Sequence, residues 1–260
     1  NAGHGLPFDS EGMKERYPRV FFSQFTGAEL VADKWNLSRE DLDNFALESH
    51  QKAAHATESK YFDREILPVE GKNAEGIDDL VLADEGIRFD ASIDKLAGLK
   101  PVTEGGVITA GNASQITDGA AAVMICNDAG LKKIQSNPRA EIVSISVVGD
   151  DPVFMLTGPI PASFKALEAA NLSIDDMDLY EVNEAFAPVP LAWAKDLKAD
   201  KLKLNVNGGA MALGHPLGAT GAKLMTTLLY EMERREAVYG LQAICEGGGT
   251  ANATIIKRVS

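Results

Sequence analysis

The sequence predicts an α/β fold, because strand-like and helix-like segments alternate along most of its 260 residues. Apolar runs of strand length, such as "YGLQAIC" (239–245), are separated by longer segments with apolar residues at helical spacing, such as 218–236. Glycines such as Gly247–Gly249 mark turns between them. The composition, 45% hydrophobic and 24% charged, is that of a globular protein able to bury a substantial core.

The clearest helix is predicted over residues 36–60. Ser38 followed by Asp41 resembles a helix-capping pair. One face of this segment carries apolar and small side chains at helical spacing: Leu42, Phe45, Ala46, Ser49 and Ala53. His50 and His55 are five residues apart, whereas a helical metal-binding pair is four apart, so we interpret both as partly exposed helix residues.

The next part of the chain carries weaker patterns. Residues 61–106 are predicted to be rich in loops, with short strands near 65–70. The apolar run from Ala120 to Ile125 is interpreted as a fully buried strand. Cys126 at its end is interpreted as core filling, because cysteine is among the most often buried residue types.

The last 120 or so residues are predicted to form a domain of alternating strands and helices. Strands are expected over 140–150, 177–182, 239–245 and 250–259, and helices over 161–172 and 218–236. Pro188 and Pro190 closely follow the second of these strands, 177–182. Because proline is poorly tolerated inside a helix, we expect the helix there to begin near 189–191.

Charge and cysteine content exclude several classes of protein. The formal charge of 25 − 38 = −13 argues against nonspecific binding to nucleic acid or anionic membranes, but leaves room for a local basic pocket. No apolar run approaches the ~18 residues of a membrane span, and residues 1–18 lack the features of a signal or transit peptide. We therefore expect a cytoplasmic protein, with an organelle as the alternative. Two cysteines provide neither a disulfide framework nor a zinc site, and we expect no bound metal.

Three polar side chains follow predicted strands or a glycine-rich loop: Asn183, His215 and Cys245. In α/β proteins, ligands bind beyond the carboxyl ends of strands. Cysteine and histidine together can transfer protons, and an asparagine amide can stabilise an oxyanion. These groups suit acyl or carbon–carbon bond chemistry at a thioester. A structural role is the alternative, since a lone histidine or cysteine is more often part of a packed core. The stretch around His215 matches neither a Walker A nor a dinucleotide-binding motif.

Four separated motifs resemble those of the thiolases, the acetyl-CoA acyltransferases. They are "TAGNASQITDGAAAV" (109–123), "VNEAFA" (182–187), "NGGAMALGHPLGATGAK" (207–223) and "CEGGG" (245–249), and they occur in the family's order. Residues 38–69 also resemble the helical part of the family's loop domain. The resemblance covers nearly the whole chain and implies a layered αβαβα fold. It divides the chain into 1–116, the remainder of the loop domain, and 117–260, mainly the C-terminal thiolase domain.

The resemblance also implies roles for individual residues. His215 matches the base that deprotonates the nucleophilic cysteine and helps to bind the thioester oxygen. Cys245 matches the acid/base cysteine that moves a proton to or from the α-carbon of acetyl-CoA. Asn183 matches the residue that holds a water of the first oxyanion hole, and Gly247 the backbone N–H donor of the second.

Coenzyme A and acyl-CoA are implied as substrates, with no permanently bound cofactor. Ser114 matches a serine that contacts the pantetheine arm, and Ala185 and Phe186 match residues that line the same tunnel. Arg88 corresponds more loosely to an arginine near the CoA nucleotide. The family is usually dimeric or tetrameric, so the resemblance implies a homo-oligomer. It does not distinguish degradation from biosynthesis, or fatty acyl from sterol substrates.

One expected residue has no match. Thiolases carry an acyl-accepting cysteine before the segment seen here, and Cys126 and Cys245 are the two cysteines of this chain. We therefore expect these residues to be the C-terminal part of a longer enzyme, inactive alone, which agrees with a first residue that is Asn1 rather than methionine. The alternatives are a non-catalytic thiolase-like protein that binds CoA or lipid, a subunit completed by another chain, and a ketoacyl synthase, against which the "CEGGG" cysteine argues.

Overall fold

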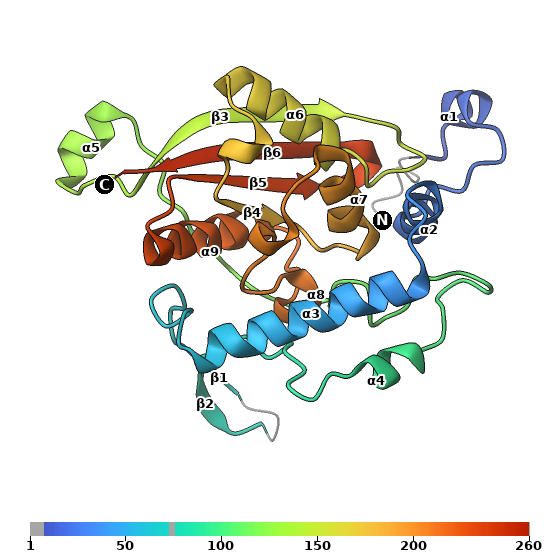
Figure 1. Ribbon diagram of the computed structural model, residues 1–260, viewed down its shortest axis with the longest axis horizontal. Coiled ribbons are helices and arrows are strands. Elements are labelled where there is room, and N and C mark those ends of the chain that lie inside the picture. The colour runs from blue at the N-terminus through green and yellow to red at the C-terminus, as the bar shows by residue number, and fades with distance from the viewer. Residues whose placement is uncertain (1–7, 73–75, 260) are drawn as a thin grey trace.

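The computed structural model describes residues 8–72 and 76–259, and a four-stranded sheet forms its centre (Figure 1). Along the sheet the strands are β3 (Ala140–Gly149), β6 (Thr250–Arg258), β5 (Tyr239–Cys245) and β4 (Leu179–Val182). The first two junctions are antiparallel, whereas β4 and β5 run parallel. The parallel pair brings the carboxyl ends of β4 and β5 to the same edge of the sheet, where ligand sites of α/β proteins lie.

Helices cover both faces of this sheet. On one face lie α6 (Pro159–Ala170) and α7 (Pro188–Leu197), and α9 (Thr220–Arg235) lies on the other (Figure 1). Successive side chains along a strand point to opposite faces of the sheet, so each strand presents one set of side chains to α6 and α7 and the other set to α9. Two serines of β3 donate to the carbonyl oxygens of Ala166 and Ala162 in α6, and Leu228 and Met232 of α9 pack against Leu179 of β4.

The N-terminal part of the chain packs beneath the sheet around a long helix, α3 (Arg39–Glu58), which contacts the one-turn helix α8 (Ala210–Leu213) (Figure 1). Ser38 and Asp41 form a reciprocal capping box at the start of α3. The remaining elements are α1 (Glu11–Arg16), α2 (Gln24–Lys34), β1 (Val69–Lys72), β2 (Asp78–Val81), α4 (Ile93–Ala97), α5 (Asp128–Ile134) and the 3₁₀ turns Ile174–Asp176, Lys201–Lys203 and Gly247–Gly249. None of the helices in the described ranges is long and apolar enough to cross a membrane.

Most of the predicted elements are confirmed. The predicted helices over 36–60, 161–172 and 218–236 correspond to α3, α6 and α9, and the four strands predicted in the last part are β3, β4, β5 and β6. The residues predicted for the inner face of α3 are buried, as expected from their spacing. The helix α7 begins at Pro188 rather than near 189–191, because the first helical position needs no amide donor and accepts proline.

The prediction for 120–125 is wrong. This segment is extended but pairs with no strand in the described part of the chain, and each of its residues is exposed, Met124 by 76% and Ile125 by 72%. Cys126 is likewise exposed rather than core filling. His50, expected to be partly exposed, is buried instead. It is only 6% exposed, and its Nδ1 atom accepts a hydrogen bond from the backbone N–H of Arg88. Residues 1–7, with which the predicted first domain begins, lie outside the described residues.

Glu65 makes the stability of this packing depend on pH. Its carboxylate accepts a hydrogen bond from Thr227 of α9 at 3.0 Å, and burial raises its pKa to about 7. A carboxyl group whose pKa is raised on folding favours the folded state below its unfolded pKa of 4.5, and this contribution is lost as pH rises through about 7. We expect Glu65→Gln, which keeps the acceptor for Thr227, to increase the free energy of unfolding at pH 8 by about 1–3 kcal/mol.

Urea denaturation of both proteins at pH 4.5 and pH 8 measures this effect. At the lower pH the two unfolding free energies should agree, because Glu65 is then protonated in the folded protein and resembles glutamine. An equal difference at both pH values contradicts the assignment.

Candidate active site

Two of the predicted catalytic side chains meet at the edge of the sheet. Asn183 directly follows β4, where its backbone N–H donates to the carbonyl of Ala243 in β5, and its side chain is 1% exposed. Its Nδ2 atom lies 3.4 Å from Nε2 of His215, which follows α8. The Oδ1 atom of Asn183 is buried and has no hydrogen-bond partner among the described residues. The pair therefore offers one unused acceptor beside an imidazole.

Thr220 determines the tautomer of His215. The Thr220 hydroxyl lies 2.6 Å from Nδ1 of His215 and donates to the carbonyl oxygen of Pro216 at 3.0 Å. Because a hydroxyl has a single hydrogen, it must accept from His215, which places the imidazole proton on Nδ1. Burial lowers the pKa of His215 and so favours the neutral ring. The Nε2 lone pair, which faces Asn183, is then available as a base.

Cys245 stands at the end of the neighbouring strand. It is the last residue of β5, pairs with Ala251 of β6, and is 7% exposed. Burial raises the pKa of its thiol to about 12, so at neutral pH it is a protonated thiol that can give up a proton only to a strongly basic partner. The parallel pairing of β4 and β5 places Cys245 at the same edge of the sheet as Asn183.

The glycines before His215 allow its loop to approach the protein interior. Gly208 has a φ of +80°, and a Cβ atom there would lie 2.5 Å from the carbonyl oxygen of Ser49 in α3. At Gly209 a Cβ atom would lie within 2.3–2.7 Å of the carboxyl group of Glu184. The loop is thus held against α3 and the "VNEAFA" segment, and glycine allows this close approach because it has no Cβ atom.

Three of the four residues predicted to contact CoA lie together. The backbone N–H of Ser114 donates to the carbonyl of Ala185 at 3.0 Å, and the neighbouring Ala113 forms a β-bridge with Phe186. Ser114 is partly exposed, whereas Ala185 and Phe186 are 7% and 3% exposed. Arg88 is separate from this group, with an exposed side chain on the loop that covers His50.

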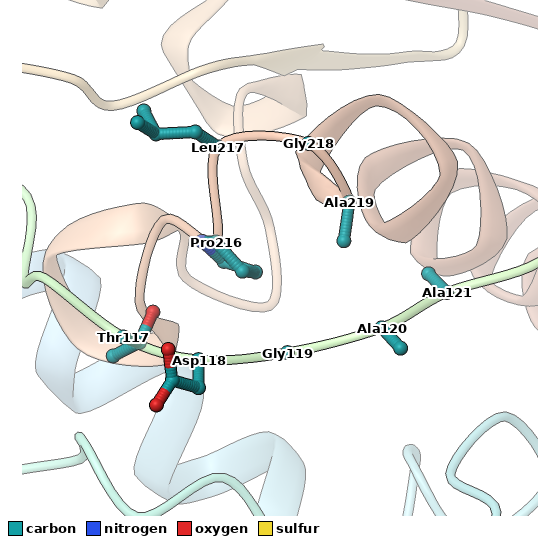
Figure 2. A pocket seen from close by; sticks show the side chains of 9 residues that line it. All are labelled: Thr117, Asp118, Gly119, Ala120, Ala121, Pro216, Leu217, Gly218 and Ala219. Carbon is teal, nitrogen blue, oxygen red and sulfur yellow. The ribbon is translucent and has the colours of Figure 1, made fainter. Parts of the chain in front are cut away.

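Open space lies beside the loop that carries His215. Gly247 is exposed in the turn after Cys245, and apart from its chain neighbours no atom of the described residues lies within 4 Å of the position of a Cβ atom there, so a ligand can reach its backbone. A pocket of about 420 Å³ lies between residues 117–121 and 216–219, where Pro216 and Ala219 face the extended segment (Figure 2). It borders the residue that follows His215. No group of three or more potential metal ligands occurs in the described ranges.

Comparisons with known proteins identify the family of the chain. Family models of the thiolase N-terminal and C-terminal domains match residues 11–129 and 136–258. The chain is 53% identical to the steroid 3-ketoacyl-CoA thiolase FadA6 of Mycobacterium tuberculosis over 251 residues, 96% of this chain and 60% of that protein. It is 42% identical to the 3-ketoacyl-CoA thiolase of Serratia proteamaculans over 261 residues, 98% of this chain and 67% of that protein.

The chain belongs to the thiolase family. Solved structures confirm the predicted fold class, since human mitochondrial 3-ketoacyl-CoA thiolase superimposes with a TM-score of 0.87 at 43% identity. Bacillus anthracis acetyl-CoA acetyltransferase gives 0.88 at 40% identity. The chain covers 59% and 61% of those two chains, so it spans about three fifths of the length of these thiolases.

Sequence reasoning missed two residues that shape this candidate site. Thr220 was not singled out, although it lies in the quoted "GATGAK" stretch five residues after His215. Glu184 is part of the "VNEAFA" motif, yet no role was predicted for it. Its carboxylate accepts from the Ser49 hydroxyl at 2.7 Å, from Nδ2 of Asn205 at 2.9 Å and from the backbone N–H of Met211 at 3.1 Å. A buried acid inside a recognised motif was the available signal.

Proposed function

We propose that the full-length protein transfers acyl groups at CoA thioesters, by thiolysis of 3-oxoacyl-CoA or by condensation of acetyl-CoA. The observation that carries this proposal is a neutral imidazole whose unprotonated Nε2 contacts the Asn183 amide, at the strand edge where Cys245 ends β5. A base, an amide and a protonated thiol are the groups that proton transfer at an α-carbon requires. The relatives named as thiolases and acetyl-CoA acetyltransferases support it.

In the proposed thiolysis, Nε2 of His215 takes the proton of a nucleophilic cysteine that lies outside these 260 residues. The thiolate attacks the 3-oxo carbon, with the developing oxyanion held by the backbone N–H of Gly247. The bond between C2 and C3 breaks, leaving an acyl group on the cysteine and the enolate of acetyl-CoA. Cys245 gives its proton to the enolate carbon and recovers one from the incoming CoA thiol. The CoA thiolate then attacks the acyl group, and the bond between the acyl carbon and the cysteine sulfur breaks. The released cysteine thiolate takes back its proton from Nε2 of His215.

The enolate oxygen is stabilised by His215 and by a water held on Asn183. The buried Oδ1 atom of Asn183 accepts no bond from the described residues, so it can accept one hydrogen of that water while the other points to the enolate. Removing one hydrogen-bond donor to such an oxyanion typically costs a few kcal/mol of transition-state stabilisation.

We further propose that CoA enters along Ser114, Ala185 and Phe186, with its nucleotide toward Arg88, as a substrate and without a permanent cofactor. The backbone contacts between residues 113–114 and 185–186 are consistent with one wall of such a channel. The division into 1–116 and 117–260 and a homodimeric or homotetrameric assembly are proposals that follow from the family resemblance. A cytoplasmic location is a proposal that rests on the sequence features alone.

We expect the 260 residues alone not to cleave acetoacetyl-CoA in the presence of CoA, because the acyl-accepting cysteine is missing from the shorter chain. The full-length protein should cleave this substrate. The loss of the acetoacetyl-CoA enolate absorbance measures both. As a control, binding of CoA to each protein shows that the shorter chain is folded. Turnover by the 260 residues without a second chain contradicts the proposal.

A second candidate is a non-catalytic thiolase-like protein that binds CoA or lipid, or a subunit completed by another chain. It is favoured by the cysteine inventory, since Cys245 is a buried strand-end residue and Cys126 lies beside α5, at the end of the molecule away from α8 (Figure 1). If the full-length protein binds acyl-CoA but forms no acyl-enzyme detectable by intact mass, this second candidate is correct.

A further inference from the structure

Glu181 and Gln242 form an unusual buried pair on the face of the sheet that packs against α9. They are register partners in the parallel strands β4 and β5, so their side chains leave neighbouring strands on the same face. Glu181 is 2% exposed and Gln242 is 3% exposed. Glu181 Oε2 and Gln242 Oε1 are both buried, and neither has a hydrogen-bond partner among the described residues.

The amide of Gln242 is satisfied at its nitrogen but not at its oxygen. Its Nε2 atom donates to the carbonyl oxygen of Gly221 at 3.0 Å, in the first turn of α9. The amide oxygen therefore needs a donor from elsewhere. Two buried acceptors on adjacent strands can satisfy each other only if one of them carries a proton, and an amide oxygen cannot.

The surroundings of Glu181 favour its neutral form. Burial is the main cause that raises its pKa well above the ordinary value, and the carboxylates of Glu184, Glu65 and Glu231 add to the shift. Lys223 opposes it but forms its recorded ion pair with Asp84, at 3.8 Å. No cation makes an ion pair with Glu181 among the described residues. An ionised carboxylate in such a place would be unpaired and costly.

We propose that Glu181 is a neutral carboxylic acid whose O–H donates to Gln242 Oε1, and that this pair positions the first turn of α9 and thereby His215. The connection runs from Glu181 to Gln242, from its amide to the carbonyl of Gly221, and from the adjacent Thr220 to Nδ1 of the imidazole. Glu181 is thus a positioning residue. Only the activity readout of the proposal rests on the proposed function.

Glu184 provides a matched contrast three residues away. It is equally buried, at 1%, but its two oxygens accept three hydrogen bonds from Ser49, Asn205 and Met211. Burial raises the pKa of Glu184 too, and these donors oppose the shift. A carboxyl group that receives three donors and needs to donate nothing is suited to the ionised form. Two neighbouring glutamates are therefore assigned opposite protonation states.

Replacement by glutamine separates these states. In Glu181→Gln the new NH₂ group can donate to Gln242 as the acid proton did, so we expect the ring-nitrogen chemical shifts of His215 to stay at their wild-type values and kcat to stay within about twofold. In Glu184→Gln an NH₂ group would face a donor, and the shifts and kcat should both change. Glu181→Leu removes the donor and should lower kcat roughly tenfold at unchanged KM.

The proton itself can be observed without any activity. In the full-length protein at pH 7, the infrared difference spectrum between wild type and Glu181→Gln should contain the carbonyl band of one neutral carboxylic acid. The corresponding spectrum for Glu184→Gln should instead contain the bands of a carboxylate. Gln242→Leu, which removes the acceptor, should alter the His215 shifts as Glu181→Leu does, and it keeps the test decisive if the latter does not fold.

Two results would overturn the inference. One is a carboxylate band for Glu181 at pH 7. The other is a Glu181→Gln variant whose His215 ring shifts differ from wild type as much as those of Glu181→Leu. If the infrared and ring-nitrogen results hold but no variant has measurable turnover because the wild type has none, the positioning is correct and the proposed function is the part that fails.

Discussion

His215→Ala in the full-length protein is expected to lower kcat for acetoacetyl-CoA thiolysis about 100- to 10,000-fold, the range that general acid–base catalysis typically contributes. The reason is structural as well as chemical. The imidazole is neutral, because burial lowers its pKa, and its proton is fixed on Nδ1 by Thr220, so Nε2 beside Asn183 is the basic atom. Removing it leaves the nucleophilic thiol without a base and the enolate oxygen without one of its partners.

Thr220 gives the matched control for this variant. Thr220→Val removes the hydroxyl that accepts from Nδ1 of His215 while preserving shape, and should reduce kcat about tenfold. Thr220→Ser keeps the hydroxyl and should retain near wild-type kcat. Steady-state kinetics on the three variants, with circular dichroism to confirm folding, measures the series. Loss of less than about tenfold in His215→Ala would remove His215 from the role of base.

The elements that the structure confirms are those whose sequence patterns arise from interactions between residues or elements close in sequence. The apolar face of α3 and the capping pair Ser38–Asp41 are local features, so periodicity and side-chain chemistry were sufficient to predict them. The strands β5 and β6 are joined by a short turn, and their pairing follows from their adjacency in sequence. In these cases local preference and tertiary packing agree.

The failure at 120–125 has a different physical origin. An apolar run indicates that a segment favours burial, but burial requires a partner surface. No described strand pairs with residues 120–125. The same argument applies to Cys126 and, in the opposite sense, to His50, whose burial depends on the loop around Arg88. Side-chain pattern alone does not state which distant segment will cover a residue.

The side chains of the candidate site could be singled out from the sequence, but the contacts that hold them in place could not. Asn183, His215 and Cys245 were recognisable because each follows a strand or glycine-rich turn and has reactive chemistry, and the structure brings Asn183 and His215 into contact. The contacts that hold them, from Thr220 and Glu184, depend on side-chain directions within loops. No periodicity encodes those directions, so the two residues emerged only from the three-dimensional arrangement.

Cys245→Ala in the full-length protein should lower kcat for thiolysis about 100- to 10,000-fold while leaving acyl transfer between the nucleophilic cysteine and CoA largely intact. The thiol at the end of β5 has a pKa raised by burial to about 12, so it holds its proton throughout the physiological range. Its proposed task is to give that proton to the enolate carbon, a step that occurs only when a carbon–carbon bond breaks or forms. Exchange of labelled CoA into acetyl-CoA involves no such step.

The two reactions therefore distinguish a proton donor from a packing residue. Exchange is measured with isotopically labelled CoA, and thiolysis with acetoacetyl-CoA, on the same preparation of Cys245→Ala. Ala243→Ser, at a buried position two residues earlier in β5, serves as the control for a small disturbance of the strand. If exchange and thiolysis fall in parallel in Cys245→Ala, the cysteine supports the site by packing, and the proton must come from another group. If thiolysis alone is lost, Cys245 is the acid that the strand end presents to the α-carbon.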